Sequence, residues 1–389
     1  MRCEYRKVKL ADLTTTGKGT YGIAASGVEK NDNLYTYLRI TDINDDGTLN
    51  RSDMKSVADD DAVQYLLKPN DIVFARTGGS TGRNYFYDGK DGTFVYAGFL
   101  IKFSIDPLKV NPKYIKYYCQ SDVYKNWVRS FNTGSTRGNI NAQTFGNMEI
   151  PLPPREQQDY LVSVLEPLDE KIAINRAIND NLQQQVMALY AEMFLNSSNN
   201  DVTSGTLSDI AVITMGQSPS GSSYNEDGVG EVFYQGRAEF GFRFPKRRLF
   251  TTEPKRMAET GDVLLSVRAP VGDLNVAYER CCIGRGLGAI HSKTGHSSFV
   301  LYTMFALRSQ LDVFNGEGTV FGSINRDALN AIPIDIPPVT EIDQFEVVAH
   351  PIDELIRANY EENCRLEAIR DSLLPKLMSG EIDVSAIQL

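Results

Sequence analysis

The chain has 389 residues, which is long enough for two or three domains and for a sizeable buried core. Hydrophobic residues make up 42% and charged residues 23%, as in ordinary globular proteins, and no run of 18 apolar residues indicates a membrane span. Five cysteines without a CxxC pattern and only three histidines argue against a Cys/His zinc site. The N-terminus lacks the apolar core of a signal peptide, so we expect a cytoplasmic protein.

The net charge of −10 is distributed unevenly along the chain. Residues 1–150 carry a net charge of +3 and residues 201–335 of −2, whereas the shorter segments 151–200 and 336–389 carry −4 and −7. The total does not exclude a nucleic-acid partner, because local patches decide such binding. One basic patch lies in a short stretch of the second half and consists of Arg237, Arg243, Lys246, Arg247, Arg248, Lys255 and Arg256.

The chain repeats itself at a fixed offset. Residues 140–182 match residues 324–366 without a gap, and the matching pairs include Asn141/Asn325, Pro153/Pro337, Asp159/Asp343, Asp169/Asp353, Asn175/Asn359 and Asn179/Asn363. Identity at so many positions predicts a tandem duplication of one structural unit.

Each half is therefore a globular head followed by a helical tail. We expect the first head at 1–150, its tail at 151–200, the second head at 201–335 and its tail at 336–389. The heads are predicted to be β-rich, because the segments 71–75 and 262–267 are short apolar runs entered from a turn. Helices are expected inside the heads at 112–131 and 297–314, and Cys281-Cys282 are expected in a strand, so the fold class is α+β.

Both tails show a heptad seam of apolar residues, which is typical of paired helices. The first seam is Leu161, Leu165, Leu168, Ile172, Asn175, Asn179, Leu182, Val186, Leu189 and Met193, and the second is Phe345, Ala349, Ile352, Ile356, Asn359, Asn363, Leu366, Arg370, Leu373 and Leu377. Because proline interrupts a helix interior, we expect Pro167 and Pro351 to begin the long helices, at about 167–195 and 351–374. Pro375 is expected to end or kink the second.

The two tail helices are predicted to pair with each other as a long antiparallel two-helix coiled coil that separates the heads. This arrangement has a pseudo-two-fold axis. Polar seam residues commonly fix the register of such a pair. We expect Asn175 and Asn179 to lie near Asn359 and Asn363. Packing of each helix on its own head is the alternative.

The sequence offers no catalytic constellation. No phosphate-binding GxxxxGK[ST] loop is present, and His291, His296 and His350 have no partners at the spacing of a catalytic triad or a metal site. The segment Asn111–Tyr114 (NPKY) only partly matches the Asn-Pro-Pro-Tyr of amino-methyltransferases, and no cofactor loop accompanies it. Two heads held apart by a stiff spacer suit a partner with a long-range repeat, such as DNA.

Several segments resemble the specificity (S, HsdS) subunit of type I restriction-modification systems. The resemblance covers the whole chain in the right order and is weakest in the first head. It rests on Met148–Gln158 (MEIPLPPREQQ), Leu168–Ile172 (LDEKI), Ile332–Pro338 (IPIDIPP), Leu374–Ile382 (LPKLMSGEI), Gly216–Gly221 (GQSPSG) and Gly261–Arg268 (GDVLLSVR).

The resemblance implies that each head is a target recognition domain for one half of a bipartite double-stranded DNA site. The helices would set the gap between the halves and dock two modification (M) subunits, which carry S-adenosylmethionine and methylate adenine. Restriction (R) subunits would add cleavage driven by ATP and Mg. This chain would bind no cofactor or metal and catalyse nothing.

Candidate DNA-contacting residues are basic and polar side chains in the loops of the two heads. In the first head they are Arg76, Ser80, Thr81, Arg83, Asn84, Ser135, Thr136, Arg137 and Asn139. In the second they are Arg237, Arg243, Lys246, Arg247, Arg268, Thr319, Ser323 and Asn325.

Two other functions remain open at this point. A duplicated β-domain module for carbohydrate or peptide, with a coiled-coil spacer, would have no affinity for DNA. A fused restriction-methyltransferase enzyme would need the cofactor loop and catalytic motif described above.

Overall fold

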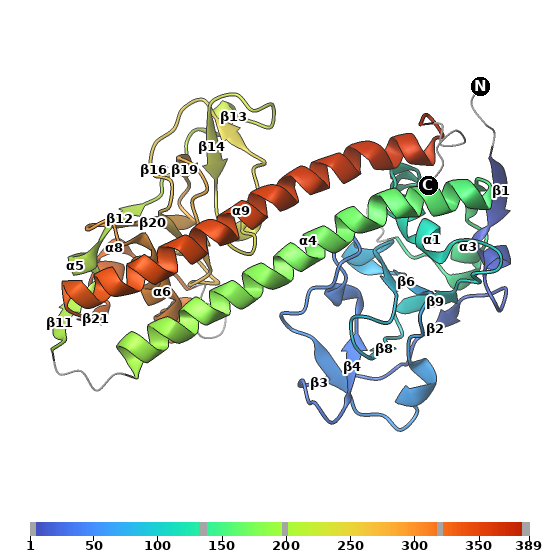
Figure 1. Ribbon diagram of the computed structural model, residues 1–389, viewed down its shortest axis with the longest axis horizontal. Coiled ribbons are helices and arrows are strands. Elements are labelled where there is room, and N and C mark those ends of the chain that lie inside the picture. Colours follow the sequence, from blue (N-terminus) through green and yellow to red (C-terminus); the bar gives the residue numbers. More distant parts are fainter. Residues whose placement is uncertain (1–4, 132–137, 197–200, 317–321, 383–389) are drawn as a thin grey trace. The chain divides into compact units, whose positions relative to one another are not determined.

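The computed structural model describes residues 5–131, 138–196, 201–316 and 322–382 (Figure 1). The chain divides into two units: unit 1 comprises Met1–Ala173 and Asn363–Leu389, and unit 2 comprises Ile174–Glu362. Each unit therefore contains one head together with a part of each tail.

Among its described residues, the head of unit 1 has two four-stranded sheets, a strand pair and three short α-helices, besides 3₁₀ turns. Its strands are β1 (Arg6–Lys9), β2 (Thr20–Tyr21), β3 (Gly27–Val28), β4 (Tyr35–Leu38), β5 (Lys55–Val57), β6 (Asp71–Ala75), β7 (Asn84–Tyr87), β8 (Phe94–Tyr96), β9 (Leu100–Ser104) and β10 (Glu149–Leu152). The sheet orders are β2-β9-β6-β7 and β3-β5-β4-β8, and β1 pairs with β10. The helices are α1 (Pro112–Tyr118), α2 (Asp122–Arg129) and α3 (Ala142–Gly146).

The head of unit 2 repeats this topology. Its strands are β11 (Thr203–Thr206), β12 (Ala211–Met215), β13 (Tyr224–Asn225), β14 (Glu231–Tyr234), β15 (Phe250–Thr251), β16 (Met257–Ala258), β17 (Val263–Ser266), β18 (Leu274–Val276), β19 (Cys281–Ile283), β20 (Leu287–Ser292) and β21 (Pro333–Ile336). The sheet β12-β20-β17-β18 matches β2-β9-β6-β7, the sheet β13-β15-β14-β19-β16 matches the second sheet, and β11 pairs with β21. The helices are α5 (Leu207–Ile210), α6 (Ser297–Ala306), α7 (Arg308–Asp312) and α8 (Arg326–Asn330).

These elements confirm the duplication and the β-rich heads. The two predicted head helices are each divided in two, because the chain turns after Tyr118 and again after Ala306. The matching residues Asn141 and Asn325 have the same role, since each side chain caps the N-terminus of a short helix.

The tail helices are longer than the sequence predicts. Helix α4 spans Arg155–Tyr190, followed by a π-helical turn at Ala191–Leu195, and α9 spans Val339–Met378. The expectation that Pro167 and Pro351 begin new helices is therefore wrong, as is the expectation that Pro375 ends the second.

The position of the three prolines explains why the helices continue. All three are exposed, so the backbone carbonyls that lose their partners can bond to water. The opposite face stays buried on both sides of each proline. The flanking buried residues are Leu165 and Ile172 for Pro167, Ala349 and Ile356 for Pro351, and Leu374 and Leu377 for Pro375. We infer that continuous burial of the seam outweighs the ~3 kcal/mol cost of a helical proline.

Helices α4 and α9 run antiparallel where they meet within each unit. In unit 1, Leu161 and Leu165 share a core with Leu374 and Leu377. In unit 2, Asn359 donates from Nδ2 to Asn179 Oδ1 at 2.8 Å, and Asn179 Nδ2 donates to the carbonyl of Ile356 at 3.1 Å. Asn175 is fully buried and donates to Glu362, and Asn363 is 7% exposed.

A half-buried aspartate on each tail helix anchors the adjacent head. In unit 1, Asp169 accepts hydrogen bonds from Lys116 (2.7 Å) and Tyr117 (3.0 Å) of the head and pairs with Arg370 of α9 (3.2 Å). Figure 1 shows α1, which carries the two head residues, beside α4. Arg370 is thus an anchor partner, although the heptad pattern places it in the apolar seam; neighbouring Ile369 is 47% exposed.

The second anchor uses Asp353, the residue that matches Asp169 in the repeat. It accepts hydrogen bonds from Arg243 Nη1 (3.0 Å) and from the Tyr302 hydroxyl (2.9 Å), which lies on α6. Arg243 also donates to Gln183 of α4 at 3.0 Å, and its side chain is only 3% exposed. Two further matching aspartates contact the residue that precedes a head helix. Asp159 accepts from Asn111, just before α1, at 2.7 Å, and Asp343 lies 2.8 Å from the ring Nε2 of His296, just before α6.

Within the described residues, no helix is both long and apolar enough to cross a membrane.

We expect Asn179→Ala to destabilise unit 2 by about 1–3 kcal/mol, because Asn359 then loses its acceptor inside a buried seam. The double variant N179L/N359L should lose less, since it leaves no unpaired amide. Denaturant unfolding measures both, with the exposed Gln184→Ala as the control. Equal stability of N179A and Q184A would contradict a packed polar layer.

Asp169→Asn should destabilise unit 1 by about 2 kcal/mol at pH 7, because it removes the charge of a half-buried carboxylate that accepts charged hydrogen bonds from Lys116 and Arg370. Burial opposes ionisation of Asp169, but Lys116 and Arg370 outweigh it and hold the carboxyl pKa below its usual value. This stability is therefore present above the usual pKa of ~3.9 and is lost as the pH falls through the folded-state pKa.

The difference between D169N and the unchanged protein should shrink below about pH 4. Unfolding curves at a series of pH values test this. Glu170→Gln, at the next position in an exposed ion pair with Lys90, serves as the control and should change stability little. A deficit in D169N that does not vary with pH would contradict the ion-pair account.

Candidate nucleic-acid interface

The strands of the first head converge at one end of its sheet. Four backbone segments meet there, and we name them the first tip: residues 21–23, 76–82, 96–100 and 138–142. The amides of Gly22 and Ile23 donate to the carbonyls of Leu100 and Tyr96. The amide of Arg76 donates to the carbonyl of Phe99 at 3.1 Å, and the carbonyl of Arg76 accepts from Ile140 at 2.9 Å.

The second head repeats this pattern, bond for bond. The second tip consists of residues 215–218, 235–237, 267–268, 283–287 and 322–325. The amides of Gly216 and Gln217 donate to the carbonyls of Leu287 and Ile283. The amide of Val267 donates to the carbonyl of Gly286 at 3.0 Å, and its own carbonyl accepts from Ile324 at 3.1 Å.

The shared backbone explains why glycine occupies the same place in both tips. A Cβ atom on Gly22 would lie 2.2 Å from the carbonyl oxygen of Tyr96, and one on Gly216 would lie 2.1 Å from that of Gly284. Only glycine permits so close an approach. The hydrogen bonds also place Val267 of the second tip where Arg76 lies in the first, so Arg268 corresponds to Thr77. Arg268 forms a β-bridge with Ser323, and Thr77 forms one with Asn139.

The first tip brings together some of the predicted DNA-contacting residues. The Arg76 guanidinium lies over the ring of Tyr21, with Cζ 5.1 Å from the ring centre. Thr81 donates to the carbonyl of Gly138 at 2.9 Å, which holds the loop containing Ser80 against the neighbouring segment. Asn139 is exposed. Ser135, Thr136 and Arg137 lie outside the described residues.

Two predicted residues of the first head have internal partners. Arg83 donates to Asp45 at 2.7 Å and to the carbonyl of Ile43 at 3.1 Å. Asn84 is 7% exposed and donates to the carbonyl of Cys119 at 3.2 Å. A buried amide with a backbone partner supports packing, so Asn84 is a poor candidate for contact with DNA.

In the second head, the prediction for Arg243 needs correction. The sequence places it in a basic patch, but its guanidinium is buried in the second anchor. To reach DNA, this group would have to break its hydrogen bonds to Asp353, Gln183 and Tyr302, and Asp353 would lose its cation. Asn325 caps α8, although it remains exposed. Thr319 lies outside the described residues.

The other predicted side chains of the second head are at the surface. Arg237 pairs with Asp273, and Arg247 pairs with Glu279. Lys246 and Arg268 are exposed, and within the described residues no carboxylate forms an ion pair with either. Ser323 is exposed beside Arg268. Uncompensated cations of this kind can neutralise phosphate or donate to base edges.

Sequence reasoning missed several residues of the tips. Ser218 lies at the centre of the second tip, where its hydroxyl accepts from the Arg285 amide (3.3 Å) and from Gln235 Nε2 (3.5 Å). Gln217, Gln235 and Arg285 are exposed. In the first tip, Tyr21 and Phe99 are 42% and 58% exposed. The GQSPSG motif pointed to part of this set, but only strand pairing brings the rest together.

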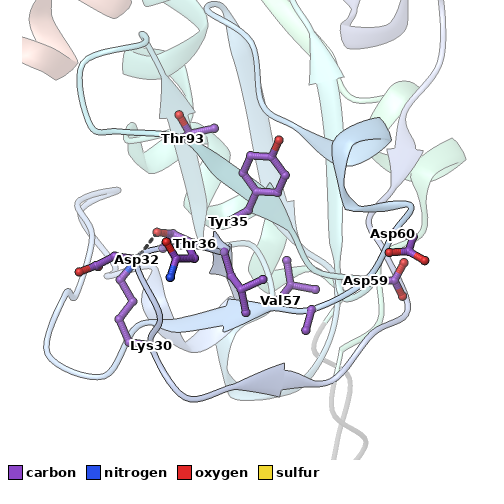
Figure 2. Close-up of a pocket in the computed structure, with 11 residues that line it drawn as sticks. Lys30, Asp32, Tyr35, Thr36, Val57, Asp59, Asp60 and Thr93 are labelled. Atoms are coloured by element: carbon purple, nitrogen blue, oxygen red, sulfur yellow. Dashed lines mark hydrogen bonds between the residues drawn. The ribbon is translucent and has the colours of Figure 1, made fainter.

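A separate hollow lies in the other sheet of the first head. Figure 2 shows Tyr35 and Thr36 of β4, with the Lys30 ammonium donating to Thr36 Oγ1 at 2.7 Å. Asp32, Asp59 and Asp60 also line it. These carboxylates would repel the phosphate groups of DNA, so we leave the hollow out of the candidate interface. Within the described residues, no group of three His, Cys, Asp or Glu side chains could hold a metal ion.

Comparison with known proteins identifies the family. The model of the type I restriction modification DNA specificity domain matches residues 3–184 and again 199–363. A Methanocaldococcus jannaschii protein named "Putative type I restriction enzyme MjaX specificity subunit" is 30% identical over 352 residues, which cover 85% of this chain and 83% of that protein. The MjaIX specificity subunit of the same organism is 21% identical over 306 residues, covering 71% of this chain and 70% of the relative.

A solved structure agrees at the level of the fold. The S subunit of a type I restriction-modification system from M. genitalium has a TM-score of 0.55 and 17% identity, with 96% of each chain covered. The repeated family match coincides with the duplication seen in the strands and tips. This chain therefore belongs to the family of type I restriction-modification DNA specificity subunits.

Proposed function

We propose that the chain is the sequence-reading subunit of a type I restriction-modification complex, in which each head reads one half of a bipartite double-stranded DNA site. One observation carries the proposal: the two tips share one backbone but present different side chains. The first tip presents Tyr21, Arg76 and Phe99, whereas the second presents Gln217, Gln235, Arg268 and Arg285. A shared backbone that carries different side chains suits two domains that recognise different DNA sequences.

Within this proposal, the heads are the two target recognition domains, at about 1–150 and 201–335. The DNA-contacting set consists of the exposed and half-buried predicted residues, Arg76 among the latter, together with the additional tip residues; Arg243 and Asn84 are left out. The duplicated carbohydrate- or peptide-binding module is not favoured, because the family match covers both halves of the chain.

The tails at about 151–200 and 336–389 are proposed to dock protein subunits. Their net charges of −4 and −7 disfavour contact with phosphate. Part of this negative charge is neutralised by cations of the same chain, as at Asp169 and Asp353. Helix α4 also exposes Ile174 and Ile178, one turn apart, at 54% and 41%. Exposed isoleucines in this arrangement favour a partner surface.

The proposed partners are two modification subunits and the restriction subunits. S-adenosylmethionine would be bound by the former, and ATP and Mg by the latter. This chain would deliver DNA to them and perform no chemistry itself. It would act in the cytoplasm, where those subunits meet DNA.

Arg268→Ala should relax the preference at one base pair of one half-site by about 1–3 kcal/mol, because an exposed guanidinium beside Ser323 suits contact with a base edge. Sequencing of methylated DNA from cells that express the complex measures the preference. Arg280→Ala is the matched control, since Arg280 is exposed in the same head but paired with Glu231 and Glu259. If R268A and R280A gave the same motif as the unchanged chain, Arg268 would not be a reader.

The double variant I174D/I178D should fold but fail to co-elute with the modification subunit in gel filtration. Two carboxylates would have to be desolvated in an apolar contact. The matched control is E170Q, another exposed change on α4, which should co-elute. Normal co-elution of I174D/I178D would place the docking surface elsewhere.

A further inference from the structure

Phe99 occupies an unusual position in the first tip. It lies in the turn between β8 and β9, and 58% of its side chain is exposed. The neighbouring chain is fixed: Leu100 is fully buried, its amide donates to the carbonyl of Ala97 at 2.8 Å, and the carbonyl of Phe99 accepts from Arg76. The ring is therefore exposed on a turn whose backbone is fixed by hydrogen bonds and by burial of the next residue.

The fold does not need a side chain at this position. The bond-for-bond match of the two tips places Gly286 where Phe99 lies, and Gly286 makes the same backbone contact with Val267. A phenyl ring that is 58% exposed gains little from folding, because most of its apolar surface stays in water. The second tip excludes a side chain here, because a Cβ atom on Gly286 would lie 2.8 Å from the carbonyl oxygen of Gln235. The first tip has room for one, and a ring that stays 58% exposed on a fixed turn indicates a contact with a partner of the first head.

The neighbouring groups define the chemistry of that contact. The Arg76 guanidinium is held over Tyr21, whose ring is fixed because its hydroxyl accepts from the amide of Ala142 at 3.2 Å. Within the described residues, no carboxylate forms an ion pair with Arg76. A guanidinium without an ion-pair partner favours the O6 and N7 atoms of guanine, which lie in the major groove. The same groove exposes the C5 methyl group of thymine.

We propose that Phe99 is a base-contacting residue of the first head, which packs its ring against the methyl group of a thymine beside the base read by Arg76. This inference rests on the proposed function of the chain. It adds a specificity-determining residue that charge and polarity do not identify. Tyr21 acts as a positioning residue, because it orients Arg76.

The test uses the full chain in complex with its modification subunits, on duplexes that contain the sequence it methylates. Each thymine is replaced singly by uracil, which removes the methyl group and keeps the base pair. Fluorescence anisotropy measures binding by the unchanged chain, F99G, F99L and a control, Val63→Ala. Val63 is 57% exposed in the same head but lies outside the tip. F99G copies the residue of the second tip, and circular dichroism checks its fold.

We expect one uracil to weaken binding by the unchanged chain about fourfold, equivalent to the burial of one methyl group at ~0.8 kcal/mol. F99G should bind the thymine duplex correspondingly more weakly and be insensitive to that uracil, F99L should keep part of the discrimination, and V63A should behave as the unchanged chain.

The proposal is overturned if no uracil distinguishes the unchanged chain from F99G. It is equally overturned if F99G loses the same affinity for every duplex, because the ring would then act as a wedge between bases. A complex that methylates no preferred sequence would instead contradict the proposed function.

Discussion

The structure depends on one half-buried carboxylate in each tail helix. Asp169 and Asp353 occupy matching positions of the two repeats and have the same role, because each accepts a tyrosine hydroxyl and a cation from its own head. An ionised aspartate inside a protein is tolerated only with such partners. The requirement therefore fixes each head on its helix, whereas an apolar contact alone would permit sliding. The tyrosines come from corresponding helices, Tyr117 from α1 and Tyr302 from α6, whereas the cations come from different elements: Lys116 from α1 and Arg243 from the segment between β14 and β15.

The two tips show the complementary principle. Their backbone hydrogen bonds are the same, and their glycines meet the same steric demand at Gly22 and Gly216. The side chains differ: an aromatic ring and a guanidinium in one tip correspond to amides and guanidinium groups in the other. The steric demand differs at one position, because the first tip holds Phe99 where a Cβ atom on Gly286 of the second would lie 2.8 Å from the carbonyl oxygen of Gln235. The shared hydrogen bonds therefore allow the exposed side chains to change while the fold stays the same. This separation of frame and contact is what a family of DNA specificity subunits requires.

The sequence predicted the large features because they leave a repeating signal. The constant offset between matching residues revealed the duplication, and the heptad seams revealed the paired helices. The seam could not show that Pro167, Pro351 and Pro375 face water, which is why the helix starts were misplaced. Charge counting could not distinguish Arg243, which is buried, from Lys246, which is exposed. Phe99 gave no signal at all, because an aromatic residue next to a strand ordinarily indicates core. Only the strand pairing places it beside Arg76.

The central claim is that each head reads its own half of the DNA site independently. It is tested most directly by replacing residues 201–335 with the corresponding head of the MjaX relative and sequencing the DNA that the resulting complex methylates. The account predicts that one half of the methylated motif changes and the other half stays as it was. A motif that changes in both halves, or in neither, would contradict it.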